Sequence, residues 1–334
     1  FGTDIRLLKN RIGFDISYFE DTYTNQITQA SISSSSGYTS RLINSDKKTR
    51  TKGWEITMNS TPVKTENFSW DLALNWSRTR DWLIQAESGK NGRDGYVKEG
   101  EKYGYLYYRN EFETTPDGQF VYRNGLPVKS NGVTNLGFGP SNWVGGLSSS
   151  FKYKDWFLSF SVDGRWGGLL YSRSNQKLWE SGKHINSANE QYRDADNRDE
   201  KTYIAEGQKI VSGTLTMDEE GFIKEDTRVF EKNDVPVYYR SWANAYYNQS
   251  VYTTSMFDAT YLKLREVILS YTIPSEWTKK IGLKGASVAF IGRNLFLWTK
   301  EESYMDPDVQ GGSGETRLYV PTPRNLGFNV KLNF

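Results

Sequence analysis

The chain has 334 residues, and its 42 Lys and Arg against 40 Asp and Glu leave a net charge of +2, which gives no reason to expect a nucleic-acid partner. It contains no Cys and a single His, so disulfide scaffolds, thiolate metal sites and cysteine nucleophiles are excluded. No apolar run approaches the roughly 18 residues that a membrane helix needs.

Period-two alternation of apolar and polar residues dominates the chain and predicts β-strands. The alternating runs lie at residues 11–21, 52–61, 68–77, 143–153, 156–166, 260–273, 287–298 and 325–334. A short strand that ends near Leu8 brings the total to about nine. The run at 260–273 changes phase after Leu264, which predicts a β-bulge near Arg265 and Glu266, because one extra residue flips the face. No amphipathic helix of useful length is found.

The connections between the predicted strands alternate strictly between short and long. Short turns lie at 9–10, 63–67, 154–155 and 274–285, and long loops at 25–50, 83–142, 168–259 and 299–322. Outer-membrane barrels have short periplasmic turns and long extracellular loops, whereas structureless stretches of more than about 15 residues are uncommon in compact domains. The pattern therefore predicts an all-β fold, a transmembrane antiparallel β-barrel. A soluble β-sandwich, propeller or lectin-like fold is the alternative.

The two faces of the strands have different predicted surroundings. The apolar side, which includes Leu72, Phe160 and Phe328, is predicted to face acyl chains. The polar side is predicted to face the lumen at Asp71, Asn75, Asp163 and Arg165. Trp and Tyr favour the headgroup layer of a membrane. Rings near the predicted strand ends that fit such a girdle are Trp54, Trp70, Trp82, Trp143, Tyr153, Trp156, Trp166 and Trp298.

Several stretches resemble SusC/RagA-type TonB-dependent outer-membrane transporters. They are KTRTKGWEITMNSTPVKTENFSWDLALNWSRTRD (48–81), NWVGGLSSSFKYKDWFLSFSVDGRWGG (142–168), YLKLREVILSYTIP (261–274), GRNLFLWTK (292–300) and PTPRNLGFNVKLNF (321–334). An Asp306-Pro307-Asp308-Val309 loop precedes the last stretch. The order of these stretches, more than any one of them, carries the resemblance. It extends over nearly the whole chain, and the long loops match only loosely.

The resemblance implies that residues 1–334 are the C-terminal portion of a transporter barrel. This portion would hold about nine of 22 strands, and the plug and the N-terminal strands would lie outside this chain. The final alternating strand, which ends at Phe334, is similar to the segment that the barrel-assembly machinery reads. The implied location is the outer membrane, as a multi-pass barrel surrounded by outer-membrane lipid.

The function implied by the resemblance is active import of an oligomeric nutrient, with an oligosaccharide as the first expected ligand and an oligopeptide as the second. The implied partners are a SusD-like surface lipoprotein that covers the barrel, TonB through the missing N-terminal part, and the remaining strands and plug of the same transporter. A passive porin and a soluble glycan-binding β-protein remain alternatives.

No spacing of carboxylates, hydroxyls and the single His indicates catalysis, so we expect no enzyme activity, no cofactor and no metal site. The long loops are rich in aromatic residues, whose faces stack on sugar rings or peptide side chains. The candidate ligand-binding residues are Tyr103, Tyr105, Tyr107, Tyr108, Arg109, Trp179, Tyr203 and Trp242. The alternative for each of them is packing between loops or contact with the covering lipoprotein.

Overall fold

The computed structural model describes residues 1–109, 111–247, 251–309, 315–316 and 320–334. Its main feature is one antiparallel sheet of nine strands, in which neighbours in the chain are neighbours in space. In sheet order these are β1 (Gly2–Leu7), β2 (Ile12–Tyr23), β5 (Lys48–Lys64), β6 (Phe68–Gln85), β13 (Trp143–Tyr153), β14 (Trp156–Trp166), β21 (Tyr261–Ile273), β22 (Gly285–Thr299) and β24 (Asn325–Asn333). All nine predicted strands are confirmed.

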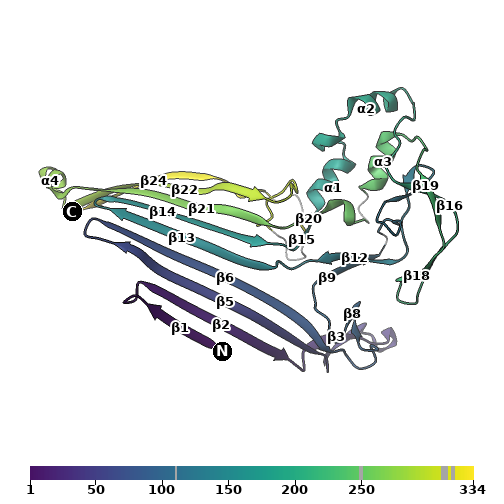
Figure 1. Cartoon of the computed structure of the whole chain (residues 1–334), viewed down its shortest axis with the longest axis horizontal. Helices are drawn as coiled ribbons and strands as arrows, with labels where there is room; N and C mark the ends of the chain where they lie inside the picture. Colours follow the sequence, from purple (N-terminus) through teal and green to yellow (C-terminus); the bar gives the residue numbers. More distant parts are fainter. Residues whose placement is uncertain (110, 248–250, 310–314, 317–319) are drawn as a thin grey trace.

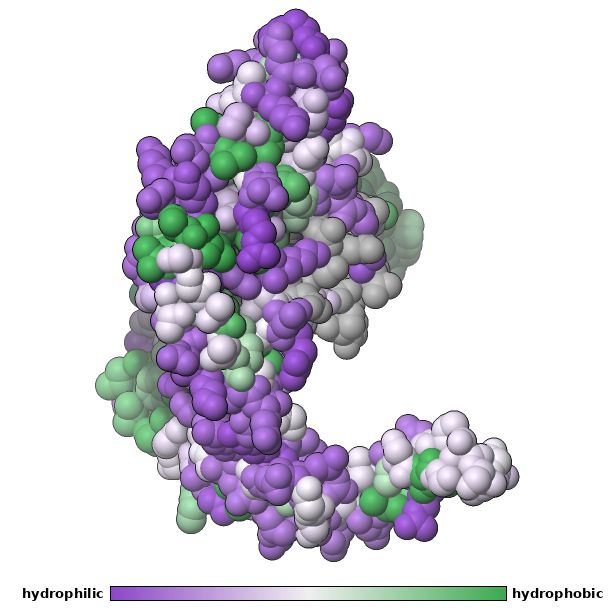
Figure 2. Space-filling view, turned by 90° about the vertical axis from the view of Figure 1, so that its right-hand side faces the viewer, coloured by the Kyte–Doolittle hydropathy of each residue, from purple (hydrophilic) through white to green (hydrophobic). Residues whose placement is uncertain are grey.

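The sheet is curved, so that the molecule forms an open trough (Figure 2). Its long strands run side by side, with α1–α3 gathered beyond one end and α4 at the other (Figure 1). Cross-strand register keeps each kind of residue on one face. Leu72 lies opposite Ser149, which lies opposite Phe160. Three residue pairs further toward the long loops, and on the opposite face, a row carries Asn75, Gly146 and Asp163.

The structure tests two further predictions, the β-bulge near Arg265 and the surroundings of the apolar face. The pairing of β21 shifts between Leu264 and Glu266 against β22, which confirms the predicted bulge. The apolar side chains named as facing acyl chains are not sealed in a core: Leu72 and Phe160 are half-buried, and Phe328 is 79% exposed. This arrangement fits a wall whose apolar face is covered by lipid, and it does not fit a soluble sandwich with two packed layers.

Exposed aromatic rings mark two levels on the apolar face. Near the short turns, the exposed ring of Trp156 lies 4.7 Å from that of Tyr271, measured between ring centroids. Near the long loops, Trp143 stacks on Trp166 with centroids 6.1 Å apart. The 11 residues from Trp156 to Trp166 span about 33 Å along the strand, or about 25 Å after a tilt of about 40°. That height matches the apolar band of an outer-membrane barrel.

The remaining predicted girdle residues divide between these levels and a loop. Trp54 and Trp298 are exposed near the long loops, and Tyr153 is exposed near the short turns. Trp70 lies two residue pairs further from the short turns than Tyr153, and it stacks on Phe151. Trp82 differs, because it lies between Lys52 and Lys102 at the base of a loop.

The alternation of short and long connections is also confirmed, but the long connections are not structureless. After β2 comes a hairpin of β3 (Ile27–Ser31) and β4 (Ser40–Asn44), with η1 (Ser34–Ser36) between them. The connection from β6 to β13 holds β7 (Arg93–Asp94), β8 (Val97–Lys98), β9 (Tyr105–Arg109), β10 (Val121–Arg123), β11 (Leu126–Pro127) and β12 (Val133–Phe138).

The connection from β14 to β21 contains the helices that sequence analysis did not find. It holds β15 (Leu169–Ser172), α1 (Arg173–Glu180), η2 (Ile185–Ser187), α2 (Glu190–Asn197), β16 (Gln208–Ser212), β17 (Leu215–Met217), β18 (Ile223–Asp226), β19 (Val229–Lys232), α3 (Tyr239–Tyr246), η3 (Thr253–Ser255) and β20 (Met256–Asp258). The turn after β21 holds α4 (Ser275–Thr278) and η4 (Lys279–Ile281), and β23 (Glu315–Thr316) precedes β24. No helix in the described residues is long and apolar enough to cross a membrane.

Candidate functional site at the loop end of the sheet

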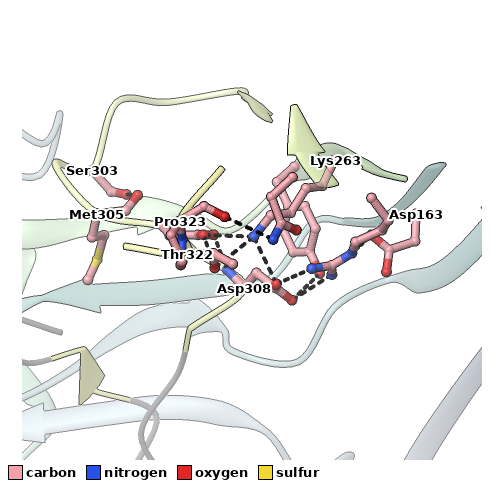
Figure 3. A network of polar contacts seen from close by, with 11 residues as sticks. Asp163, Lys263, Ser303, Met305, Asp308, Thr322 and Pro323 are labelled. Carbon is pink, nitrogen blue, oxygen red and sulfur yellow. Dashed lines mark hydrogen bonds and ion pairs between the residues drawn. The ribbon is translucent and has the colours of Figure 1, made fainter. Parts of the chain in front are cut away.

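A buried ionic network anchors the connection after β22 to the polar face of the sheet (Figure 3). The Lys263 ammonium donates to Asp306 at 2.7 Å, to Asp308 at 3.1 Å and to the Thr322 hydroxyl at 3.0 Å. The Lys263 and Asp306 side chains are only 2% and 5% exposed. The Thr322 hydroxyl also donates to Asp306, at 2.7 Å. The buried charge of Lys263 is therefore fully paired, as its burial requires.

A second cation extends this network toward β14. The Arg265 guanidinium sits at the bulge of β21, donates through two nitrogens to Asp308 and donates through Nε to Asp163 at 2.7 Å. Because the bulge interrupts the pleat, it re-aims this side chain toward the segment that carries Asp308. The Tyr261 hydroxyl donates to the same carboxylate at 3.1 Å.

The two loop carboxyls respond to these contacts in the same direction. The hydrogen bonds from Arg265 lower the pKa of Asp308 far below its usual range, against the effect of burial. Burial raises the pKa of Asp306, but the hydrogen bonds from Lys263 and Thr322 outweigh it and the net shift is downward. Both groups are therefore carboxylates at neutral pH, and the network holds the loop against the wall.

A polar hollow of about 670 Å³ lies beside the network, lined by residues that include Asn75, Asp163, Arg165 and Asp308. Asn75, Asp163 and Arg165 were predicted to face the lumen, and their common hollow is consistent with that prediction. The Nε of Arg165 is buried without a hydrogen-bond partner among the described residues. Asp71 lines a separate polar hollow of about 550 Å³ nearer the short turns.

Three of the candidate ligand-binding residues lie in one aromatic cluster of the β14–β21 connection. Trp179 is 8% exposed and stacks on Tyr247 with centroids 4.2 Å apart. Tyr203 and Trp242 lie 4.7 Å apart and pack against the same core. Burial raises the pKa of Tyr203 above its ordinary value. These rings hold α1, α2 and α3 together.

The other five candidates lie in the β6–β13 connection, and four of them are on β9, which pairs with β12. The Tyr103 hydroxyl donates to Asp94 at 2.6 Å, and its ring packs on a small core around Leu83. Tyr107 packs on Tyr96 and Phe222. Tyr108 stacks on Tyr252, and Tyr105 packs edge-on against Phe138. Arg109 donates hydrogen bonds to the Tyr96 hydroxyl and to the Glu220 carbonyl.

The structure thus brings the candidates into two groups in different loops. Tyr105, at 42% exposure, and Arg109 are the two whose side chains are exposed. Nothing in the structure tests which residues touch a ligand, so the set of eight stays a prediction.

Several structural residues of the loops were missed by sequence analysis. Glu111 is fully buried and accepts from the backbone of Tyr252 and Thr253, about 140 positions away in the chain. Asp196 accepts from the backbone of Tyr239 and Arg240 at the start of α3. Nothing local marks these carboxylates, because their partners are distant in sequence.

His184, the single histidine, joins two loops. Its ring stacks on Trp179 at 4.4 Å and meets the edge of Tyr304, from the connection after β22, at 4.4 Å. Its Nδ1 accepts from the backbone of Asn186 at 3.1 Å. Burial lowers its pKa, so the imidazole is neutral at neutral pH. From the sequence, a histidine in the longest loop is expected to be solvent-exposed; this expectation is wrong, because His184 is only 3% exposed.

The fold and this loop end define the class of protein: a wall of antiparallel strands with an apolar outer face, a polar inner face and large extracellular loops. No family model matches the chain. TonB-dependent receptor P39 of Formosa agariphila is 21% identical over 397 residues, which cover 99% of this chain and 35% of that protein. TonB-dependent receptor SusC of Bacteroides thetaiotaomicron is 25% identical over 194 residues, which cover 51% of this chain and 19% of SusC.

Solved structures agree in fold. The RagAB peptide importer superposes on all of this chain, with a TM-score of 0.66 in its open-open state and 0.65 in its closed-closed state, at 15% identity. This chain covers 34% of the RagAB chain in the first comparison, and about a third of the length of the curated relatives. The chain therefore resembles SusC/RagA-type TonB-dependent transporters over nearly its whole length, and its fold is that of the wall of an outer-membrane β-barrel.

Proposed function

We propose that residues 1–334 form the C-terminal portion of a barrel of about 22 strands with a plug in its lumen, and that the whole protein imports an oligomeric nutrient with energy from TonB. The observation that carries the proposal is the nine-stranded sheet itself. Its four long connections lie at one end and its short turns at the other, and 99% of the chain aligns with a TonB-dependent receptor.

The edges of the sheet support a larger barrel. Within the described part of the chain, β1 and β24 each have only one neighbouring strand. An open edge leaves backbone N–H and C=O groups without partners, which hydrocarbon does not tolerate. The remaining strands of the same protein would pair with these two edges and close the wall.

The residues of the loops support capture of a ligand by ring stacking and hydrogen bonds. The antiparallel pair of β9 and β12 carries three tyrosines and an arginine on β9, and Tyr105 and Arg109 are exposed. Such surfaces bind sugar rings by stacking and by hydrogen bonds, and we propose an oligosaccharide as the ligand, delivered by a SusD-like surface lipoprotein that covers the loop end. An oligopeptide is the second candidate, because the RagAB importer, which shares the fold, is described as a peptide importer.

Uptake by the full-length protein tests the proposal. A strain that lacks the gene is compared with the complemented strain for accumulation of labelled oligosaccharides and labelled oligopeptides of matched size. We expect uptake of one class only, and loss of that uptake when a protonophore collapses the inner-membrane proton gradient. Uptake that continues without the gradient would identify a passive porin instead. Pull-down of the native complex in detergent, followed by mass spectrometry, tests for the surface lipoprotein.

A further inference from the structure

The apolar face of the sheet carries a groove that the proposed transport function does not use. The groove has a volume of about 730 Å³ and lies at the loop end, on the face opposite the polar hollows. One cross-strand row runs through it from β5 to β22. In register this row is Ile56, Trp76, Gly145, Gly164, Leu262 and Trp298.

Two adjacent glycines interrupt the row at its middle. A Cβ on Gly164 would lie 2.3 Å from the Tyr261 carbonyl oxygen, and one on Gly145 would lie 2.9 Å from the Asn75 carbonyl oxygen. The close approach of the strands therefore requires glycine at both positions, and the surface between Trp76 and Leu262 drops to bare backbone. Strands lie about 4.8 Å apart, so this gap is about 14 Å wide between the flanking strand axes.

The walls of the gap are apolar on every side. The stacked rings of Trp143 and Trp166 close it toward the loops, because each lies two residues along its strand from a glycine of the row. Leu147 and Val162, paired across β13 and β14, close it toward the short turns. A flexible hydrocarbon chain fits such a gap, and no polar side chain of this face competes for it.

Positive charge lies directly beyond the groove on the same face. Arg78 follows Trp76 by two residues on β6 and pairs in register with Trp54 of the aromatic level. Its side chain is exposed and has no ion pair among the described residues. Lys52, in the next pair of that face, shares Glu20 with Arg50. The aromatic level marks the headgroup layer, so an occupant must be apolar below this level and anionic at it.

We propose that this groove binds an acyl chain of a phosphorylated glycolipid of the outer leaflet, with its phosphate on Arg78 and, more weakly, on Lys52. The outer leaflet is inferred from position, because Trp143, Trp166 and Trp298 line the groove at the loop end and long loops of outer-membrane barrels are extracellular. The occupant follows from charge complementarity, because an amphiphile with a phosphate at the level of the Trp rings matches both the apolar gap and the unpaired guanidinium. The inference depends only on the barrel's place in the membrane, and not on the transported ligand.

Native mass spectrometry of the full-length transporter in detergent tests this inference, with purified lipid A as the probe and phosphatidylethanolamine as the comparison lipid. We expect lipid A to bind more tightly than phosphatidylethanolamine. Arg78→Gln is expected to weaken lipid A binding about fivefold or more, since a charge-assisted hydrogen bond is lost. The matched control is Lys154→Gln, at the turn end, which should leave binding within about twofold.

A second pair of variants tests the groove itself. Leu147→Trp fills the gap from its floor and is expected to reduce lipid A binding by a similar factor. Leu158→Trp adds the same bulk to the same face at the turn end and is expected to have no effect. Heat-modifiable migration in gels confirms that each variant is folded. If Leu147→Trp fails that check, Arg78→Gln, an exposed change, decides alone. Equal binding of both lipids, or equal effects of Arg78→Gln and Lys154→Gln, would overturn the proposal and indicate bulk lipid contact only.

Discussion

Replacing Lys263 by Met removes the cation that holds the connection after β22 against the sheet. Lys263 and Asp306 are almost fully buried and lie 2.7 Å apart, so solvent screening does not reduce their interaction. Removal of one partner of such a pair costs about 3–5 kcal/mol, because the other charge stays buried without compensation. Among the described residues, the carboxylate of Asp306 then keeps the hydrogen bonds from the Thr322 hydroxyl and from the backbone N–H of Asp308. At about 1.4 kcal/mol per decade, local opening should become two to four orders of magnitude more frequent.

Hydrogen exchange of the full-length transporter measures this opening at residues 299–309. We expect Lys263→Met to lower amide protection there by that factor while the strands keep theirs. The matched control is Lys300→Met, since the Lys300–Asp258 pair is half exposed and should contribute less than about 1 kcal/mol. Adding Asp306→Asn to Lys263→Met removes the orphaned charge and should restore part of the protection. Unchanged protection in Lys263→Met, or an equal loss in the control, would refute the reasoning.

Three further predictions concern single groups. The pKa of Asp308 is lowered in the folded protein, so its ionised carboxylate stabilises the fold at pH values above the ordinary carboxyl pKa of 3.8, and this stabilisation is lost as the pH falls below 3.8. After correction for intrinsic rates, hydrogen exchange at residues 299–309 should therefore be independent of pH from about pH 5 to 8 and should rise only in stronger acid. Glu111→Gln replaces a carboxylate oxygen that accepts from the backbone of Thr253 with a donor, and proteolysis of the β14–β21 connection should show a local loss of about 1–3 kcal/mol. Gly164→Ala forces a Cβ to 2.3 Å from the Tyr261 carbonyl oxygen, and the yield of heat-modifiable barrel should fall well below that of Ser161→Ala.

The nine long strands are predictable because lipid on one side and water on the other impose a period of two that survives in the sequence. Their ends at the loop side are less predictable. The run predicted at 68–77 continues as β6 to Gln85, and β5 begins four residues before its predicted start, at Lys48. Above the membrane both faces are wet, so alternation stops while strand pairing continues. In the part of β6 beyond its predicted end, Arg78 pairs with Trp54 at the headgroup level, and Trp82 pairs with Arg50 further out.

The loop structure could not be predicted in the same way, because its contacts are distant in sequence. Lys263 and Asp306 are 43 positions apart, and Arg265 and Asp163 are 102 apart. No local sequence pattern indicates that the lysine of β21 pairs with the two aspartates of the loop. The bulge at Arg265 was predictable from the phase change, but the carboxylates that this bulge brings within reach were not.

Because loop contacts are distant in sequence, the environment of an aromatic ring can be predicted in a strand but not in a loop. The position of Trp166 in an alternating run is enough to place its ring on the apolar face, where it stacks on Trp143. Trp179 has no such run, and only the folded loop shows that it packs between His184 and Tyr247. A ring that is already stacked on both faces offers a ligand neither face. Contact with a transported ligand from this chain is therefore expected first at the exposed Tyr105, and at Trp179 only if α1 and α3 separate.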